Sequence, residues 1–210
     1  MAGNLPWSNG RLTVSENGRF LQHENGTPFF WLGDTAWLLT RLTREEAVTY
    51  LDDRREKGFN VIQMDVIHSV KSKNAYGRQP LIDEDFTKPD LAKGSHGEPS
   101  YWDHLDFLVD EAAKRGIYAA LVCVWGSEVK RGALNEADAT VYGKWLGERY
   151  KDRPNIIWFI GGDVHGTTKT QVWLNLAHAI KSVDPNHLMT FHPFGRTQSS
   201  TWFHHEPWLD

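Results

Sequence analysis

An aspartate that directly follows two glycines is the residue best placed to do acid–base chemistry in this chain. Residues 155–166 read NIIWFIGGDVHG, and the apolar run 156–160 is typical of a parallel strand buried on both faces. Gly161 and Gly162 lack Cβ atoms, so the backbone can turn sharply there and a ligand can approach. We therefore expect Asp163 at the open end of a strand, where α/β proteins carry out chemistry. It could donate a proton, or it could cap the following helix.

Histidines and tryptophans follow other predicted strands in the same way. Uncharged imidazoles can hydrogen-bond to sugar hydroxyls, and flat apolar rings suit the faces of sugars. The chain has ten tryptophans, and the alternative, that large rings fill the wall of the fold, accounts better for Trp145 and Trp173. The candidates for substrate binding among these residues are Trp37, His68, Trp125, His165, His192 and Trp202.

Three charged residues are further candidates for substrate binding. Asp34 follows the first predicted strand and could accept two sugar hydroxyls, or form a local turn. Arg196 could face an acidic sugar or a catalytic carboxylate, or be solvated, and Glu206 is the one alternative carboxylate near the predicted site. We expect no metal and no cofactor, because the strand-one His-x-His pattern of metal-dependent amidohydrolases is missing.

These residues need a scaffold of strands that alternate with helices. Apolar runs predict strands at residues 28–33, 59–67, 117–125, 156–160 and 188–191. Capping residues and apolar periodicity predict helices that begin at Thr43, Ser100, Asn135 and Thr168. Such alternation indicates right-handed βαβ units and a parallel sheet. The G-x-G-x-x-G pattern of a dinucleotide-binding sheet is missing, and candidate residues follow every strand, so we predict an α/β fold, a (β/α)₈ TIM barrel represented by its first five units.

The N-terminal part has a different pattern. Apolar and polar residues alternate around Asn17-Gly18 and Asn25-Gly26, which predicts tight antiparallel hairpins. We therefore divide the chain into an N-terminal segment with a hairpin cap, residues 1–27, and the first five barrel units, residues 28–210. A polar segment, Ser69 to Pro99, is long for a connection in a compact domain, and we expect a functional loop.

Composition narrows the possible partners. The 210 residues are 40% hydrophobic and 24% charged with a net charge of −4, which is typical of a globular protein and offers no basic field for nucleic acid. No apolar stretch has the length of a membrane span, and the first ten residues lack the features of a signal peptide, which leaves the compartment open. The single cysteine, Cys123, is expected in the core.

Taken together, these stretches resemble the apiosidase-like glycoside hydrolases, a group also described as cellulase- or endoglucanase-like and related to the retaining barrel glycosidases. The resemblance rests on FFWLGDTAW (29–37), FNVIQMDV (59–66), NIIWFIGGDVHG (155–166), FHPFGR (191–196) and SSTWFHHEPWLD (199–210). It implies a retaining glycoside hydrolase that acts on plant cell-wall or related glycans, with Asp163 as general acid/base. The related clan has Asn-Glu where this chain has Gly162-Asp163, which shortens the acid and removes an amide that usually holds a sugar hydroxyl.

The resemblance also implies a glutamate nucleophile after the seventh strand, outside this sequence. We therefore expect an oligosaccharide or polysaccharide as partner, a need for the rest of the barrel or for self-association, and no efficient hydrolysis by residues 1–210 alone. A non-catalytic carbohydrate-binding barrel or an inactive fragment is the alternative, since fold does not imply function.

Overall fold

A five-stranded parallel sheet lies at the centre of the computed structural model, which describes residues 5–210. The strands are β4 (Gly33–Thr35), β5 (Val61–Asp65), β6 (Tyr118–Val122), β7 (Ile156–Val164) and β8 (Met189–Pro193). They lie across the sheet in chain order, and each neighbouring pair is parallel. The predicted α/β class and the first five units of an incomplete (β/α)₈ barrel are confirmed. Residues 1–4 of the predicted N-terminal segment lie outside the described residues.

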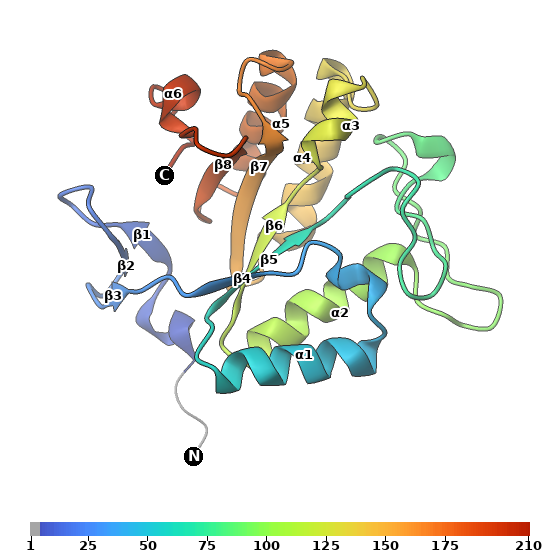
Figure 1. Cartoon of the computed structure of the whole chain (residues 1–210), viewed down its shortest axis with the longest axis horizontal. Helices are drawn as coiled ribbons and strands as arrows, with labels where there is room; N and C mark the ends of the chain where they lie inside the picture. Colours follow the sequence, from blue (N-terminus) through green and yellow to red (C-terminus); the bar gives the residue numbers. More distant parts are fainter. Residues whose placement is uncertain (1–4) are drawn as a thin grey trace.

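Helices cover the outer face of this sheet, and a small N-terminal sheet lies on its other side (Figure 1). The long helices are α1 (Arg44–Glu56), α2 (Tyr101–Lys114), α4 (Glu136–Tyr150) and α5 (Thr170–Val183). Shorter ones are η1 (Pro6–Asn9), η2 (Leu39–Arg41), η3 (Ile82–Glu84), α3 (Gly126–Lys130) and α6 (Ser200–Phe203). None of the described helices combines the length and apolar character needed to cross a membrane.

Local capping explains where most long helices begin. Capping boxes at Thr43 and Ser100 precede α1 and α2, and the side chain of Asn135 caps α4, as their sequences predict. The predicted start of α5 at Thr168 is wrong. That helix begins after Lys169, which has a φ of 55° and no capping side-chain bond.

The predicted strand at residues 28–33 is wrong, because two separate strands share this apolar run. Strand β3 (Pro28–Phe29) pairs with β2 (Leu21–His23), which pairs with β1 (Leu12–Val14), so all three form the antiparallel N-terminal sheet. Only Gly33 onwards pairs with β5. The side chain of Asn60 joins the two parts, because it accepts from the Leu32 N–H at 2.9 Å and donates to the Phe30 carbonyl at 2.7 Å. The run is a crossover, and a hydrophobic pattern does not reveal where one strand stops and the next begins.

Alternate side chains of the strands enter two cores. The outer core lies between sheet and helices, contains Trp158 and Trp173, and holds the buried thiol of Cys123, as expected. The inner core lies on the face that becomes the interior of a closed barrel, and its buried members are Leu12, Val61, Tyr118, Ala120, Val122, Ile157, Phe159 and Leu188. Trp7 and Phe29 pack edge-on against Tyr118 at the start of β6. The N-terminal sheet therefore covers the amino end of the barrel strands.

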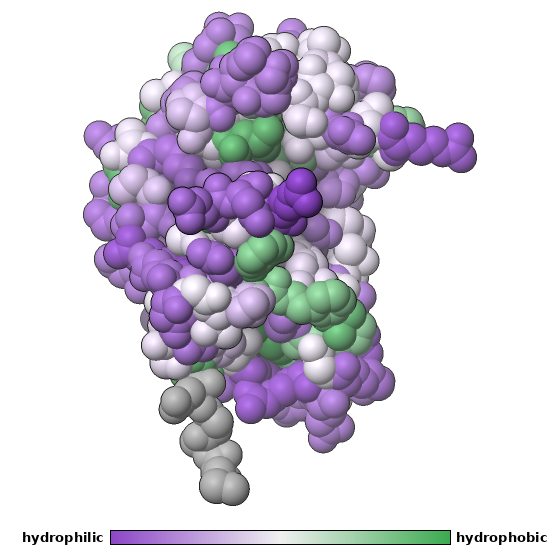
Figure 2. All heavy atoms as spheres, turned by 90° about the vertical axis from the view of Figure 1, so that its left-hand side faces the viewer, coloured by the Kyte–Doolittle hydropathy of each residue, from purple (hydrophilic) through white to green (hydrophobic). Residues whose placement is uncertain are grey.

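The inner face also has an open apolar region. Figure 2 looks at the molecule from this side and shows hydrophobic residues gathered among hydrophilic ones. A shallow hollow of about 210 Å³ lies here, lined by side chains that include Leu21, Trp31, Ile157 and Phe159. Nearby, Phe30 is 80% exposed. A face of this composition suits contact with further apolar groups.

Candidate functional site

A backbone bulge at the end of β7 presents Asp163. Gly161, Gly162 and Asp163 have φ angles of 99°, 123° and 50°, and the register with β8 shifts between Gly161 and Val164. A Cβ on Gly161 would lie 2.5 Å from the carbonyl oxygen of His192, and one on Gly162 would lie 2.8 Å from the Gly126 nitrogen. Both positions therefore require glycine. The bulge leaves the Asp163 side chain 57% exposed at the carboxyl end of the strand.

His192 on β8 is the closest described partner of Asp163. The Asp163 N–H donates to His192 Nδ1 at 3.3 Å, and the carboxylate Oδ1 lies 3.8 Å from the same nitrogen. Because Nδ1 accepts, the neutral ring carries its proton on Nε2. Burial lowers the pKa of His192, although the negative charge of Asp163 acts in the opposite direction. An uncharged ring with a free N–H suits a hydrogen bond to a hydroxyl.

Four rings form a continuous layer beside Asp163, which we call the aromatic layer: Trp37, His68, Trp125 and His192. Trp125 is its centre, with ring centroids 5.4 Å from Trp37, 5.7 Å from His68 and 5.8 Å from His192. Trp37 also meets His192 edge-on at 5.5 Å. The structure thus brings together four predicted binding residues that come from four different strand ends.

Three further predicted residues lie after β7 and β8. His165 stacks on Phe194 at 5.8 Å and meets Trp202 at 5.5 Å, so it belongs to a second ring group. Trp202 can approach because position 166 is glycine, where a Cβ would lie 2.7 Å from the indole. Arg196 lies in the exposed turn after β8 with a φ of 67°.

Asp34, predicted to bind sugar hydroxyls, has its carboxylate bonded to α1 and to the neighbouring backbone in this structure, and its role towards sugar stays a prediction. Its carboxylate accepts from the Tyr50 hydroxyl at 2.9 Å, from Arg54 at 2.7 Å and from the Thr35 N–H at 2.8 Å. Partial burial opposes a lower pKa, but the bonds from Tyr50 and Arg54 outweigh it and lower the pKa of Asp34. Asp34 therefore attaches α1 to β4 on the helical side of the sheet.

Glu206, predicted as a substrate-binding residue, contacts α5 and the C-terminal turn, and its role towards substrate stays a prediction. Its Oε2 lies 3.1 Å from His178 Nε2 and accepts from the Trp208 indole N–H at 3.1 Å. His178 is half exposed on α5, in the helical layer. The bond therefore fixes the C-terminal turn to α5.

Asp65, which is not among the predicted site residues, occupies the inner face at the end of β5. The strand places Asp65 on the same side as Val61 of the inner core, and the residue is 1% exposed. Its Oδ2 lies 2.7 Å from His68 Nδ1, whereas its Oδ1 is buried without a hydrogen-bond partner. Burial raises the pKa of Asp65 to about 6, although His68 opposes this and the charge of Asp163 adds to it. The period of two within FNVIQMDV could have identified it as an inward-facing carboxylate.

We expect Asp65→Asn to stabilise the protein at neutral pH. The folded-state pKa lies above the unfolded value, so the folded state binds more protons and loses stability as the pH rises from about 4 through about 6. The variant avoids this loss, and its free energy of unfolding at pH 7.5 should exceed that of the parent by on the order of 2 kcal/mol. Denaturant titrations at pH 4 and pH 7.5 measure this. An advantage that is equal at both pH values would contradict the assignment.

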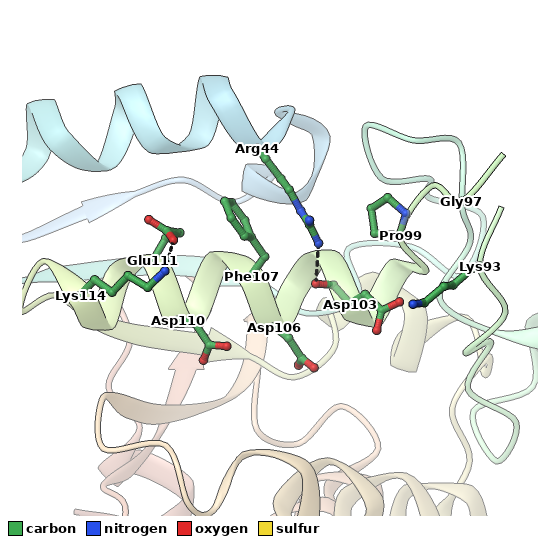
Figure 3. A pocket seen from close by; sticks show the side chains of 10 residues that line it. All are labelled: Arg44, Lys93, Gly97, Pro99, Asp103, Asp106, Phe107, Asp110, Glu111 and Lys114. Atoms are coloured by element: carbon green, nitrogen blue, oxygen red, sulfur yellow. Dashed lines mark hydrogen bonds and ion pairs between the residues drawn. The ribbon is translucent and has the colours of Figure 1, made fainter.

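A separate hollow lies along α2 (Figure 3), and no residue of the aromatic layer lines it. It has a volume of about 450 Å³, and Figure 3 shows Arg44 reaching towards α2 beside Phe107, with Lys93 and Pro99 of the long loop at one end. No predicted site residue lines it. Within residues 5–210, no three His, Cys, Asp or Glu side chains are grouped so that they could hold a metal ion.

Comparison with known proteins agrees with this arrangement. Residues 15–210 match the model of the apiosidase-like catalytic domain family. A solved structure described as a glycoside hydrolase is 53% identical, with a TM-score of 0.93 over 99% of this chain and 46% of its own length. A family 5 glycoside hydrolase from Bacteroides vulgatus is 52% identical, with a TM-score of 0.93 over 99% of this chain and 45% of its own. The chain thus spans a little under half of these structures.

More distant structures share the fold. The endo-β-1,4-mannanase from Thermotoga petrophila is 18% identical, with a TM-score of 0.64 over 80% of this chain and 43% of its own. The catalytic domain of endoglucanase Cel5A from Thermobifida fusca is 16% identical, with a TM-score of 0.59 over 90% of this chain and 57% of its own. No curated protein sequence is similar enough to the chain to count as a match.

Proposed function

The chain belongs to the apiosidase-like family of catalytic domains, and we propose that it forms the acid/base half of a retaining glycoside hydrolase. The observation that supports this most is the position of Asp163, exposed after a bulge at the carboxyl end of β7 and bordered by the aromatic layer. A carboxylic acid there can protonate the departing glycosidic oxygen while flat rings hold the sugar. The substrate class we propose is an oligosaccharide or polysaccharide of plant cell walls or related glycans.

The second carboxylate comes from outside these residues in this proposal. A retaining enzyme needs a nucleophile roughly 5 Å from the acid/base. Asp34 and Glu206 are bound in the helical layer, and Asp65 is buried against His68. After the first step, Asp163 as a carboxylate would take a proton from the water that releases the sugar.

The stereochemistry of the reaction tests the retaining mechanism. The full-length protein that contains residues 1–210 is incubated with aryl glycosides and with cello- and manno-oligosaccharides, and proton NMR identifies the first anomer formed. We expect the anomer of the substrate. The inverted anomer would contradict the retaining mechanism, and saccharide binding without hydrolysis would instead support the non-catalytic barrel.

We expect Trp125→Ala to weaken saccharide binding more than it lowers stability. The ring is only partly buried and is the centre of the aromatic layer. Loss of one stacking face should raise the dissociation constant of an oligosaccharide roughly 5-fold. Calorimetric titration and the melting temperature are compared with those of Leu108→Ala, a fully buried change in the outer core. A melting temperature as low as that of the control, with unchanged affinity, would show that Trp125 has a structural role.

We expect residues 1–210 alone to hydrolyse no aryl glycoside efficiently, because the opposing carboxylate is missing from the proposed pair. Light scattering measures whether the isolated chain self-associates through its open apolar face. A monomer whose turnover disappears in Glu206→Gln would overturn this expectation and assign Glu206 to catalysis.

A further inference from the structure

Two Asp-x-x-His pairs with the same geometry occur in this chain. Asp65 is the last residue of β5 and His68 follows it, whereas Asp184 and His187 precede β8. In both pairs Oδ2 of the aspartate lies 2.7 Å from Nδ1 of the histidine. Both aspartates are 1% exposed. The two pairs differ in their other contacts. Asp184 therefore shows what such a buried pair does for the fold, and any further role of Asp65 must come from the contacts that Asp184 lacks.

Asp184 has donors for both oxygens. Its Oδ2 also accepts from the Trp158 indole N–H at 2.7 Å, and its Oδ1 lies 3.4 Å from the backbone nitrogens of Asn186 and His187. Burial opposes ionisation, but these bonds outweigh it and lower the pKa of Asp184. His187 is itself nearly buried, so the pair stays inside the protein and connects α5 to β7.

Asp65 has one described side-chain bond, the one to His68, and its Oδ1 is buried without a partner. A carboxylate with so few donors is a strong acceptor for its remaining partner. His68, in contrast to His187, is 37% exposed and lies over Trp125 at an interplanar angle of 33°. The buried carboxylate therefore holds an accessible ring within the aromatic layer.

We propose that Asp65 is a positioning residue that holds His68 with its proton on Nδ1, so that Nε2 accepts a hydrogen bond from a hydroxyl of a sugar lying against Trp125. The inference rests on the proposed function. The geometry supports it, because the bond to Asp65 occupies Nδ1 and leaves Nε2 as the ring nitrogen open to a ligand. His192, whose Nδ1 accepts from the Asp163 N–H, would present the opposite role, a donor Nε2–H.

The two imidazoles would then recognise different hydroxyls of the bound sugar. His68 would accept from one hydroxyl and His192 would donate to another, and the Trp125 ring lies 5.7 Å from His68 and 5.8 Å from His192. A site of this kind discriminates strongly against a ring that lacks the matching hydroxyl, because a polar atom would remain unpaired. The ligand recognised in this way is a sugar with at least two free hydroxyls.

The first test reads the tautomer directly, independently of activity. The full-length protein is labelled with ¹⁵N-histidine, and His68 is assigned by the signals lost in His68→Gln. We expect protonated Nδ1 and unprotonated Nε2 in the parent at pH 8. In Asp65→Asn the amide can donate to Nδ1, and we expect a shift towards the Nε2–H form. A predominant Nε2–H form in the parent would overturn the proposal.

The second test is a double-mutant cycle on saccharide affinity. Affinity is measured by calorimetry with cellohexaose and mannohexaose, or as the KM of an aryl glycoside that the protein hydrolyses. Asp65→Asn and His68→Ala should each raise KM or the dissociation constant about 10-fold. In the His68→Ala background, Asp65→Asn should have no further effect, because Asp65 acts only through His68. Additive losses, unchanged affinity in both single variants, or no binding of either saccharide would overturn the proposal.

Asp184→Asn is the matched control, since it changes an Asp-x-x-His pair with the same Oδ2–Nδ1 distance outside the inner face. It should lower the melting temperature and leave saccharide affinity and the His68 tautomer unchanged. A different result would contradict the proposed function: turnover by Asp163→Asn at the parental rate. The tautomer and calorimetric results would then still decide the role of Asp65, because neither depends on catalysis.

Discussion

Asp163→Asn should strongly reduce turnover of substrates with poor leaving groups while sparing the first step on activated aryl glycosides. Asparagine keeps the shape of the side chain but cannot donate a carboxylic acid proton to the glycosidic oxygen. General acid catalysis contributes about 10²- to 10⁴-fold, so kcat/KM on an oligosaccharide should fall by that factor. A dinitrophenyl glycoside needs little protonation, and a burst of dinitrophenol should remain. Stopped-flow absorbance and oligosaccharide assays on the full-length protein measure both effects.

Asp110→Asn serves as the control for this experiment. Asp110 is half exposed on α2 and pairs at 2.8 Å with Arg153, which precedes the amino end of β7, whereas Asp163 lies at the carboxyl end of that strand. This variant should retain the parental kcat/KM on every substrate. Equal activity of Asp163→Asn and the parent on a natural oligosaccharide would exclude Asp163 as the acid.

Gly161→Ala should reduce both activity and stability, because the bulge has no room for a Cβ. The new methyl group would lie 2.5 Å from the His192 carbonyl oxygen at a φ of 99°, so β7 and β8 must separate. Strain of this kind costs on the order of 1–3 kcal/mol in the free energy of unfolding. A displacement of about 1 Å at Asp163 should lower kcat about 100-fold. Denaturant titration and steady-state kinetics measure the two losses.

Gly195→Ala is the matched control, because a Cβ there would meet no atom within 4 Å. It lies in the turn that follows β8, close in sequence to the same strand. We expect parental kinetics and a change in unfolding free energy within about 0.5 kcal/mol. If Gly161→Ala behaves like this control, the bulge does not determine the position of Asp163.

Most of the scaffold could be predicted because its determinants are local. Capping boxes at Thr43 and Ser100 and the continuous apolar run of β7 are written within a few residues of the elements they define. The division of residues 28–33 between two sheets was missed, since it depends on bonds to Asn60, which is 28 and 30 residues away from its two partners. Such contacts leave no trace in periodicity.

The direction of a side chain was harder to predict than its position at a strand end. Asp34 lies near the end of β4 and Asp65 at the end of β5. The side chain of Asp34 faces α1, whereas that of Asp65 faces the barrel interior. A shift of one residue in a strand exchanges the two faces, and β4 is only three residues long, so its alternation is not visible in the sequence. The contact of Glu206 with His178 of α5 was not predicted, because nothing near Glu206 in the sequence indicates it.

The strands of the parallel sheet lie side by side in the order in which they occur in the chain, and this affects how the protein can fold during synthesis. Each strand from β5 to β8 joins the edge left by its predecessor, so the sheet can grow by addition as the chain emerges, and no later segment must pass between earlier strands. At 5–20 residues per second, translation of 210 residues takes about 10–40 s. The N-terminal sheet emerges first, and Trp7 and Phe29 are already available when Tyr118 appears. We therefore expect the growing inner face to be partly shielded from aggregation throughout synthesis.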